Sequence, residues 1–116
     1  MNQAKPYIAV SVAQNEEKLW DDHFGEAPYF HIYNRHGQLI EKRDNPYWHE
    51  DHDVHTGPKK MADLLPECGV FIARAMGEGQ KILPKKFGVQ PFITTETTVQ
   101  AALQAYLAQA SSVDET

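Results

Sequence analysis

Residues 7–13 read YIAVSVA, a short stretch that is apolar on both of its faces. A strand with one face in water alternates apolar and polar residues, whereas a strand buried on both faces does not. Residues 7–13 therefore predict a strand at the centre of a sheet. Two further strand-like segments follow, YFHIYN (29–34) and LIEKRD (39–44), and the turn RHGQ (35–38) between them is typical of a hairpin.

The second half of the chain predicts strands that alternate with helices. A helix that enters through Pro58 is expected to end before Pro66, and a second one is weakened by the proline inside it, Pro84. The last helix has apolar residues at i, i+3, i+4 and i+7, and Thr97 and Gln100 have the spacing of a capping box. The predicted ranges are helices over 58–65, 80–87 and 99–110, and strands over 69–76 and 89–94.

The resulting order, βββαβαβα, predicts an α/β fold with one mixed five-stranded sheet. Short connections make the first three strands an antiparallel meander, and helical crossovers keep the fourth and fifth strands parallel to the first. The charged third strand and the proline-bearing fifth strand suit the two edges. We therefore expect the strand order 3-2-1-4-5, with helices as covering layers.

This topology predicts that four loops meet at one end of the sheet. They are the loops after strands one, three, four and five, which carry His23, the cluster His49, His52 and His55, the turn Gly77-Glu78-Gly79, and the run Thr94–Thr98. Ligands of open α/β sheets bind at the carboxyl ends of parallel strands. The turn with His36, together with Cys68 and Gly88, is expected at the opposite end.

The composition excludes several classes of protein. The 116 residues are expected to form one domain (1–116) with a polar tail at 111–116. A net charge of −5 argues against broad binding to nucleic acid or to an anionic membrane. The single cysteine, Cys68, excludes an internal disulfide and an all-cysteine metal site. The sequence has neither a run of about 18 apolar residues nor a signal-peptide pattern, so we expect a cytoplasmic protein.

All six histidines lie between His23 and His55, and three of them repeat every third residue in WHEDHDVHTG (48–57). This spacing does not place three side chains on one side of a helix or strand, so the loop must curl if the rings are to meet. Neutral imidazole suits zinc, copper, iron and nickel, and nearby carboxylates could bind the metal or orient the rings. The candidate metal ligands are His23, His49, His52 and His55.

Each of these features also has a plainer interpretation. The histidine loop could be a solvated acidic loop, and His23 in DDHFG (21–25) could be a hydrogen-bonded structural residue. The turn at Gly77 and Gly79 could offer backbone N–H groups to an anion, or could be an ordinary tight turn. His31 alternates with tyrosines along its strand, which favours packing against the sheet.

Several segments together resemble the dinitrogenase iron–molybdenum cofactor biosynthesis family. They are IAVSV (8–12), HFGEAPYF (23–30), Asn45-Pro46, GVFIARAMG (69–77) and TTVQAALQAYL (97–107). The most specific part is HFGEAPYF, of which His23, Phe24 and Gly25 match the family motif closely. Small members often carry a glycine-rich, sometimes histidine-containing segment after the third strand; here that segment is richer in histidine and poorer in glycine.

The resemblance implies a three-layer, ribonuclease H-like fold and a non-enzymatic role related to nitrogen fixation. Such a domain would bind, carry or insert metal–sulfur clusters, including precursors of the iron–molybdenum cofactor, between cluster donor and acceptor proteins. Zinc or another transition metal is the alternative cargo. We expect the cargo to contact the matched motif and the other loops at that end of the sheet, through His23, Phe24, Gly25, Gly77, Gly79 and Thr95.

Two other functions remain open. Glu50 or Asp53 could act as a general base beside a metal in a mononuclear hydrolase, whereas the first strand has no acidic residue for two-metal nuclease chemistry. Alternatively, exposed Tyr47 and Trp48 could anchor a partner in a non-metallic interaction module. The domain is expected to be a monomer or a homodimer, and a dimer would pair through an edge strand.

Overall fold

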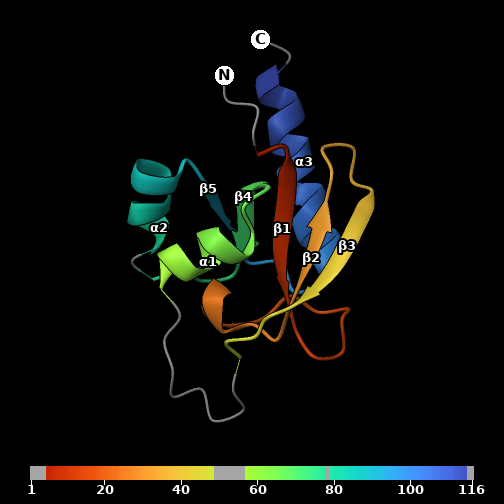
Figure 1. Ribbon diagram of the computed structural model, residues 1–116. Helices are drawn as coiled ribbons and strands as arrows, with labels where there is room; N and C mark the ends of the chain where they lie inside the picture. The colour runs from red at the N-terminus through yellow and green to blue at the C-terminus, as the bar shows by residue number, and fades with distance from the viewer. Residues whose placement is uncertain (1–4, 49–56, 78, 115–116) are drawn as a thin grey trace.

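The computed structural model describes residues 5–48, 57–77 and 79–114 (Figure 1). The elements are, in chain order, β1 (Tyr7–Val12), η1 (Phe24–Glu26), β2 (Tyr29–Tyr33), β3 (Leu39–Asp44), α1 (Pro58–Leu64), β4 (Cys68–Ala73), α2 (Gly79–Ile82), η2 (Leu83–Phe87), β5 (Gln90–Ile93) and α3 (Val99–Asp114).

The five strands form one sheet in the order β3-β2-β1-β4-β5, which confirms the predicted order. β2 pairs antiparallel with β1 and with β3, while β4 pairs parallel with β1 and with β5. β1 is central, and its residues from Ile8 to Val12 are buried, as expected for a strand that is apolar on both faces.

Helices cover both faces of the sheet, so the fold has three layers (Figure 1). One core cluster lies on the side of α1 and η2, where Ala9 of β1 packs with Met61, Leu65 and Leu83. The other lies under α3, where Val10 and Val12 of β1 pack with helix residues that include Val99 and Leu103.

None of the helices in the part of the chain that the structure describes is long and apolar enough to cross a membrane.

The structure confirms the expected start of the last helix but corrects its cap and its end. The helix begins at Val99, and its first turn is capped by Thr98, whose Oγ1 accepts the Ala101 N–H at 3.1 Å. The predicted capping box of Thr97 and Gln100 is therefore wrong by one residue, since the capping side chain is that of Thr98. The helix also continues through Asp114, into the segment expected to be a polar tail.

The segment expected as one helix over 80–87 consists of two short pieces. α2 ends at Ile82, and the wider π-helical turn η2 contains Pro84 and ends at Phe87; the next residue, Gly88, caps it by donating its N–H to the Leu83 carbonyl. Proline has no N–H for a regular helical hydrogen bond, which is consistent with the irregular backbone. Gly88 has φ +66°, in the left-handed region that favours glycine at a helix end.

Arg43 connects the β3 edge to the first helix and to β4. Its guanidinium donates to both carboxylate oxygens of Glu41 and of Glu67, and to the Leu64 carbonyl near the end of α1 at 2.8 Å. The side chain of Arg43 is only 22% exposed, so these charge-assisted bonds are partly shielded from water.

Replacing Arg43 with Met should lower the free energy of unfolding by about 1–2 kcal/mol, because the partly buried Leu64 carbonyl and Glu67 carboxylate and the exposed Glu41 carboxylate lose their donor. Urea denaturation measures the change. Lys59→Met is the matched control: Lys59 pairs with Asp63 on the exposed surface of α1, so its loss should change stability much less. Equal losses in the two variants would contradict the structural role of Arg43.

The stabilisation by Arg43 should also depend on pH. Arg43 holds the pKa of the Glu41 and Glu67 carboxyls below the usual 4.5. The folded state therefore binds fewer protons than the unfolded state near that pH, and the contribution is complete above the unfolded pKa and lost as pH falls through the lowered folded values. The stability difference between the native protein and Arg43→Met should shrink between about pH 6 and about pH 3. A constant difference would show that these carboxylates are not involved.

Candidate functional site

His23 lies at the end of the sheet where β1 and β4 finish. Because these strands run parallel, the segments that follow them leave at the same edge, and His23 forms a parallel bridge with Ala75. The Phe24 N–H donates to the Ala75 carbonyl at 3.0 Å. The structure therefore brings the His23 loop and the turn after β4 together, as predicted.

The residue after His23 fixes the turn in the core. The Phe24 ring stacks on Phe71 of β4, with ring centroids 4.5 Å apart and an interplanar angle of 7°, and also contacts Phe30 of β2. Phe24 is 2% exposed. Although it borders the site, its ring therefore serves mainly as an anchor for the backbone of η1.

Asn45 fixes the same turn from the end of β3. Its side-chain N–H groups donate to the carbonyls of Gly25 at 3.0 Å and Ala27 at 2.8 Å, and its Oδ1 accepts the Tyr47 N–H at 3.0 Å. Asn45 is buried, so these bonds replace those that water would otherwise make. One side chain thus connects the His23 turn to the residues that lead into the histidine-rich segment.

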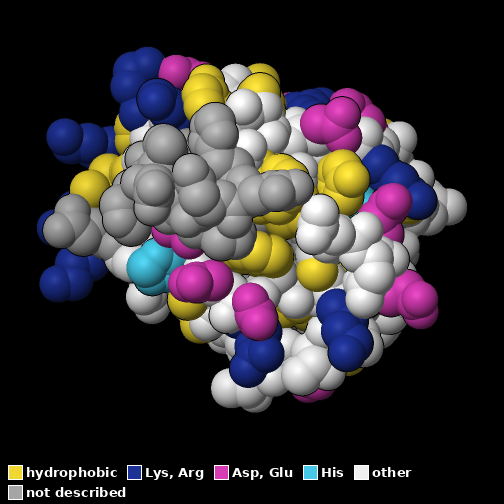
Figure 2. Space-filling view, turned by 90° about the horizontal axis from the view of Figure 1, so that it is seen from below, with side chains coloured by type: hydrophobic (Ala, Val, Ile, Leu, Met, Phe, Trp, Pro, Cys, Tyr) yellow, Lys and Arg dark blue, Asp and Glu magenta, His cyan; other side chains and the backbone are white. Residues whose placement is uncertain are grey.

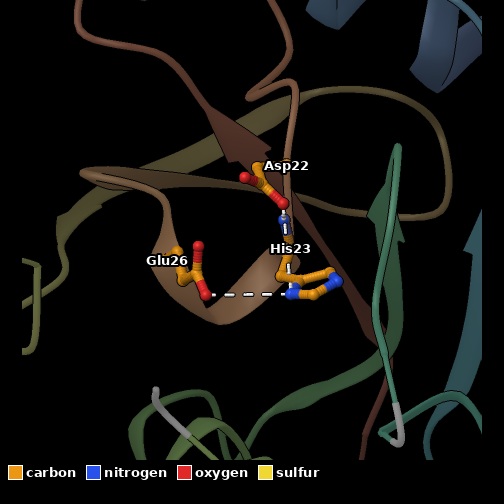
Figure 3. A group of neighbouring side chains, drawn as sticks. All are labelled: Asp22, His23 and Glu26. Atoms are coloured by element: carbon orange, nitrogen blue, oxygen red, sulfur yellow. Dashed lines mark hydrogen bonds and ion pairs between the residues drawn. The ribbon is translucent and has the colours of Figure 1, made fainter. Parts of the chain in front are cut away.

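Two carboxylates lie beside the imidazole of His23 (Figure 3). Nδ1 is 3.7 Å from Glu26 Oε2 and 4.0 Å from Asp22 Oδ1, and the same Asp22 oxygen accepts the backbone N–H of His23 at 2.8 Å. Ligand atoms of these three residues all lie within 4.8 Å of one another. Imidazole and carboxylate together suit a borderline divalent metal ion.

A pocket of about 440 Å³ opens next to His23. Its lining combines the HFGE turn, the first turn of α1, the segment after β4 and the start of η2. The lining residues are His23, Phe24, Gly25, Glu26, Gly57, Pro58, Met61, Met76, Gly77, Gly79 and Leu83. Figure 2, which views this end of the molecule, shows hydrophobic side chains beside acidic ones and a histidine.

The glycines of the lining keep this space open. Gly77 has φ +56°, and a Cβ built on it would lie 3.7 Å from Nε2 of His23. A Cβ on Gly79 would lie 3.6 Å from Cγ of Met76. A side chain at position 77 would thus occupy the space in front of Nε2, and its positive φ favours glycine in any case.

The other predicted site residues are placed differently. Thr95 is exposed between β5 and α3 and is not among the residues that line the pocket. His49, His52 and His55, with Glu50 and Asp53, lie outside the described residues.

The two aromatics expected to be exposed are not. Tyr47 and Trp48 are both partly buried, and Tyr47 packs against the core, with Nζ of Lys60 4.9 Å from its ring centroid. The structure therefore does not show these two side chains as an exposed anchor for a partner.

His31 and Cys68 lie apart from the site, as expected. His31 is 4% exposed on β2, and burial lowers its pKa, although Glu16, with Oε1 3.4 Å from Nε2, acts in the opposite direction. Cys68 is fully buried at the start of β4, and burial, with a smaller effect from Glu67, raises the pKa of its thiol to about 12. Neither residue lines the pocket.

Sequence reasoning missed two residues that shape the site, Glu26 and Asn45. Glu26 lies three residues after His23 in the motif, a spacing that places both on one side of a helical turn, but a single turn has no periodicity to reveal it. Asn45 directly follows the strand expected over 39–44, and its hydrogen bonds to a turn 18 and 20 residues earlier have no local signal.

Solved structures show the same fold. A NifB-like protein from Thermotoga that belongs to the DUF35 family has a TM-score of 0.66 and 27% identity, over 87% of this chain and 86% of that chain. The apo form of the orange protein from Desulfovibrio gigas has a TM-score of 0.69 and 20% identity, over 90% of this chain and 89% of that chain. The expected three-layer α/β architecture is thus confirmed. A search of curated proteins gives no match.

The family described as "Dinitrogenase iron-molybdenum cofactor" matches residues 6–109, nearly the whole chain. The match includes every element from β1 to β5, the HFGE turn and most of α3. It agrees with the resemblance carried by HFGEAPYF. The chain belongs to the dinitrogenase iron–molybdenum cofactor family.

Proposed function

We propose that the protein is a carrier that binds a metal–sulfur cluster, of the type from which the iron–molybdenum cofactor is built, in the pocket beside His23. The observation that carries this proposal is the orientation of the ring: Nδ1 faces Glu26, whereas Nε2 lies by Gly77, whose missing side chain leaves room for a ligand. Family membership supplies the class of cargo.

The described residues at the two ends of the histidine-rich segment support a role for it in the ligand set. Gly57, at its far end, lines the pocket, and Trp48, before its first histidine, donates its N–H to the Asn45 carbonyl at 3.2 Å. Asn45 in turn bonds to the His23 turn. Both ends of the segment are therefore held near His23, and we propose that His49, His52 and His55 supply further ligands.

Imidazole ligands suit a carrier chemically. A preassembled cluster brings its own sulfide, so the protein needs to add only a few ligands and a pocket that excludes competing groups. Cluster donor and acceptor proteins of the cytoplasm are the proposed partners. No catalytic turnover is proposed for the acidic residues of the site.

Elemental analysis and an absorption spectrum of untagged protein, purified anaerobically, test the cargo directly. Iron or molybdenum with sulfide and visible charge-transfer bands would support the proposal. Tightly held zinc alone would instead favour a structural or hydrolytic metal site. If the purified protein contains no metal and does not take up a cluster on reconstitution, the carrier function is overturned and an interaction module is favoured.

His23→Ala and the triple variant His49→Ala/His52→Ala/His55→Ala should each weaken cluster binding by about tenfold or more, because each removes ligands. Reconstitution followed by iron and sulfide determination measures the change. His36→Ala is the matched control, since His36 is exposed in the β2–β3 turn at the opposite end of the sheet. Undiminished uptake by the triple variant would remove the segment from the ligand set.

Cys68→Ala should bind the cluster as the native protein does, because the thiol is buried at the other end of β4 and its raised pKa keeps it protonated. In the folded protein, Cys68 should also resist alkylation at about pH 8 and react only after unfolding. Loss of the cluster in Cys68→Ala, with the fold retained by circular dichroism, would contradict imidazole ligation.

A further inference from the structure

We infer that Glu26 is a positioning residue for His23: it holds the proton of the neutral imidazole on Nδ1 and so makes Nε2 the metal-binding atom. The position of the proton on Nδ1 is a property of the protein without bound metal. The use of Nε2 as a ligand rests on the proposed function.

The two carboxylates beside His23 are not equivalent. Glu26 has a side chain only 11% exposed, and its Oε2 is the carboxylate oxygen nearest Nδ1, at 3.7 Å. Asp22 is 59% exposed, its Oδ1 is 4.0 Å from Nδ1, and that oxygen already accepts the backbone N–H of His23. Screening by water weakens the exposed group more, so the field at Nδ1 is set mainly by Glu26.

The backbone holds Glu26 in this position. Its N–H donates to the His23 carbonyl at 3.0 Å, which closes the η1 turn. The carbonyls of the residues on either side of it, Gly25 and Ala27, both accept from the buried Asn45 side chain. Phe24 is fixed by its stack on Phe71. Glu26 and His23 therefore lie at the two ends of one turn, and the turn holds their side chains beside each other.

A neutral imidazole carries one N–H, and a nearby carboxylate favours the proton on the nitrogen that faces it. With the proton on Nδ1, the lone pair is on Nε2, which lies on the side of the ring away from Glu26 (Figure 3). A Cβ built on Gly77 would lie 3.7 Å from this Nε2. A carboxylate behind the protonated nitrogen also makes the other nitrogen a better ligand.

Direct chelation by Asp22, His23 and Glu26 is the competing arrangement, since their ligand atoms lie within 4.8 Å of one another. In that arrangement the metal would take Nδ1 and would need both carboxylates. The two arrangements predict different results for the two acidic residues, so a matched pair of isosteric variants, Glu26→Gln and Asp22→Asn, separates them.

The first measurement is the tautomer of His23 in the apo protein, from ¹⁵N NMR of the imidazole at about pH 8, where an ordinary histidine is neutral. We expect Nδ1–H in the native protein and in Asp22→Asn. Glu26→Gln should shift the population toward Nε2–H, and Glu26→Met, which removes the acceptor, should shift it further. Backbone amide spectra establish that each variant is folded. The same tautomer in all four proteins would overturn the inference.

The second measurement is the affinity for Zn²⁺ alone, by competition with a chromophoric chelator. Glu26→Gln should bind about 10- to 100-fold more weakly than the native protein, while Asp22→Asn should be close to native. Equal losses in both variants would show direct chelation and overturn the role of Glu26. If the tautomers behave as expected but the native protein binds neither Zn²⁺ nor a reconstituted cluster, the proposed function fails and the Nδ1 assignment stands.

Discussion

The parallel pairing of β1 with β4 is the constraint on which the candidate site depends. Ala9 lies opposite Phe71 and Val10 opposite Ile72, so both strands end at the same edge of the sheet. The segment after β1 then reaches Ala75, and the turn after β4 brings Gly77 to Nε2 of His23. An antiparallel β4 would carry that turn to the opposite end. β3 also ends at this edge, because it runs parallel to β1 across the intervening antiparallel β2.

The site combines a rigid backbone with an accessible ligand atom. Phe24 is buried against Phe71, while the neighbouring His23 side chain is 46% exposed. Core packing and the bonds from Asn45 fix the turn. The conformational entropy of the turn is therefore lost during folding, so binding of a ligand does not have to order it again. In the proposed carrier, the open side of the ring beside Gly77 would leave room for the cargo to enter and leave. Both properties are useful to a protein that must bind and release the same ligand.

Local patterns predicted the sheet well, because strand order follows from which segments are apolar on both faces. Residues 7–13 identified the centre, and charge and Pro91 identified the edges. The site was less accessible to sequence reasoning. Thr97 and Thr98 are chemically identical at the start of α3, so the sequence does not show which of them caps the helix, whereas the bond from the Ala101 N–H to Thr98 Oγ1 does. Asn45 bonds to a turn that is distant in the sequence, and no periodic pattern predicts such a contact. The partial burial of Tyr47 depends on the position of α1, which the sequence around Tyr47 does not show.

The charge of the ligands explains why imidazole fits the proposed cargo better than thiolate. Each thiolate would add a negative charge to a cluster whose sulfides are already negative, and the mutual repulsion is strongest in a partly dry pocket. The one cysteine, Cys68, is removed from such a role by its burial and raised pKa. A neutral imidazole adds no charge of its own. A carboxylate beside its protonated nitrogen can raise the donor strength of the other nitrogen without contacting the metal. In this arrangement Glu26 strengthens the bond while remaining on the far side of the ring from the cargo, so its own charge acts at a greater distance than that of a direct carboxylate ligand.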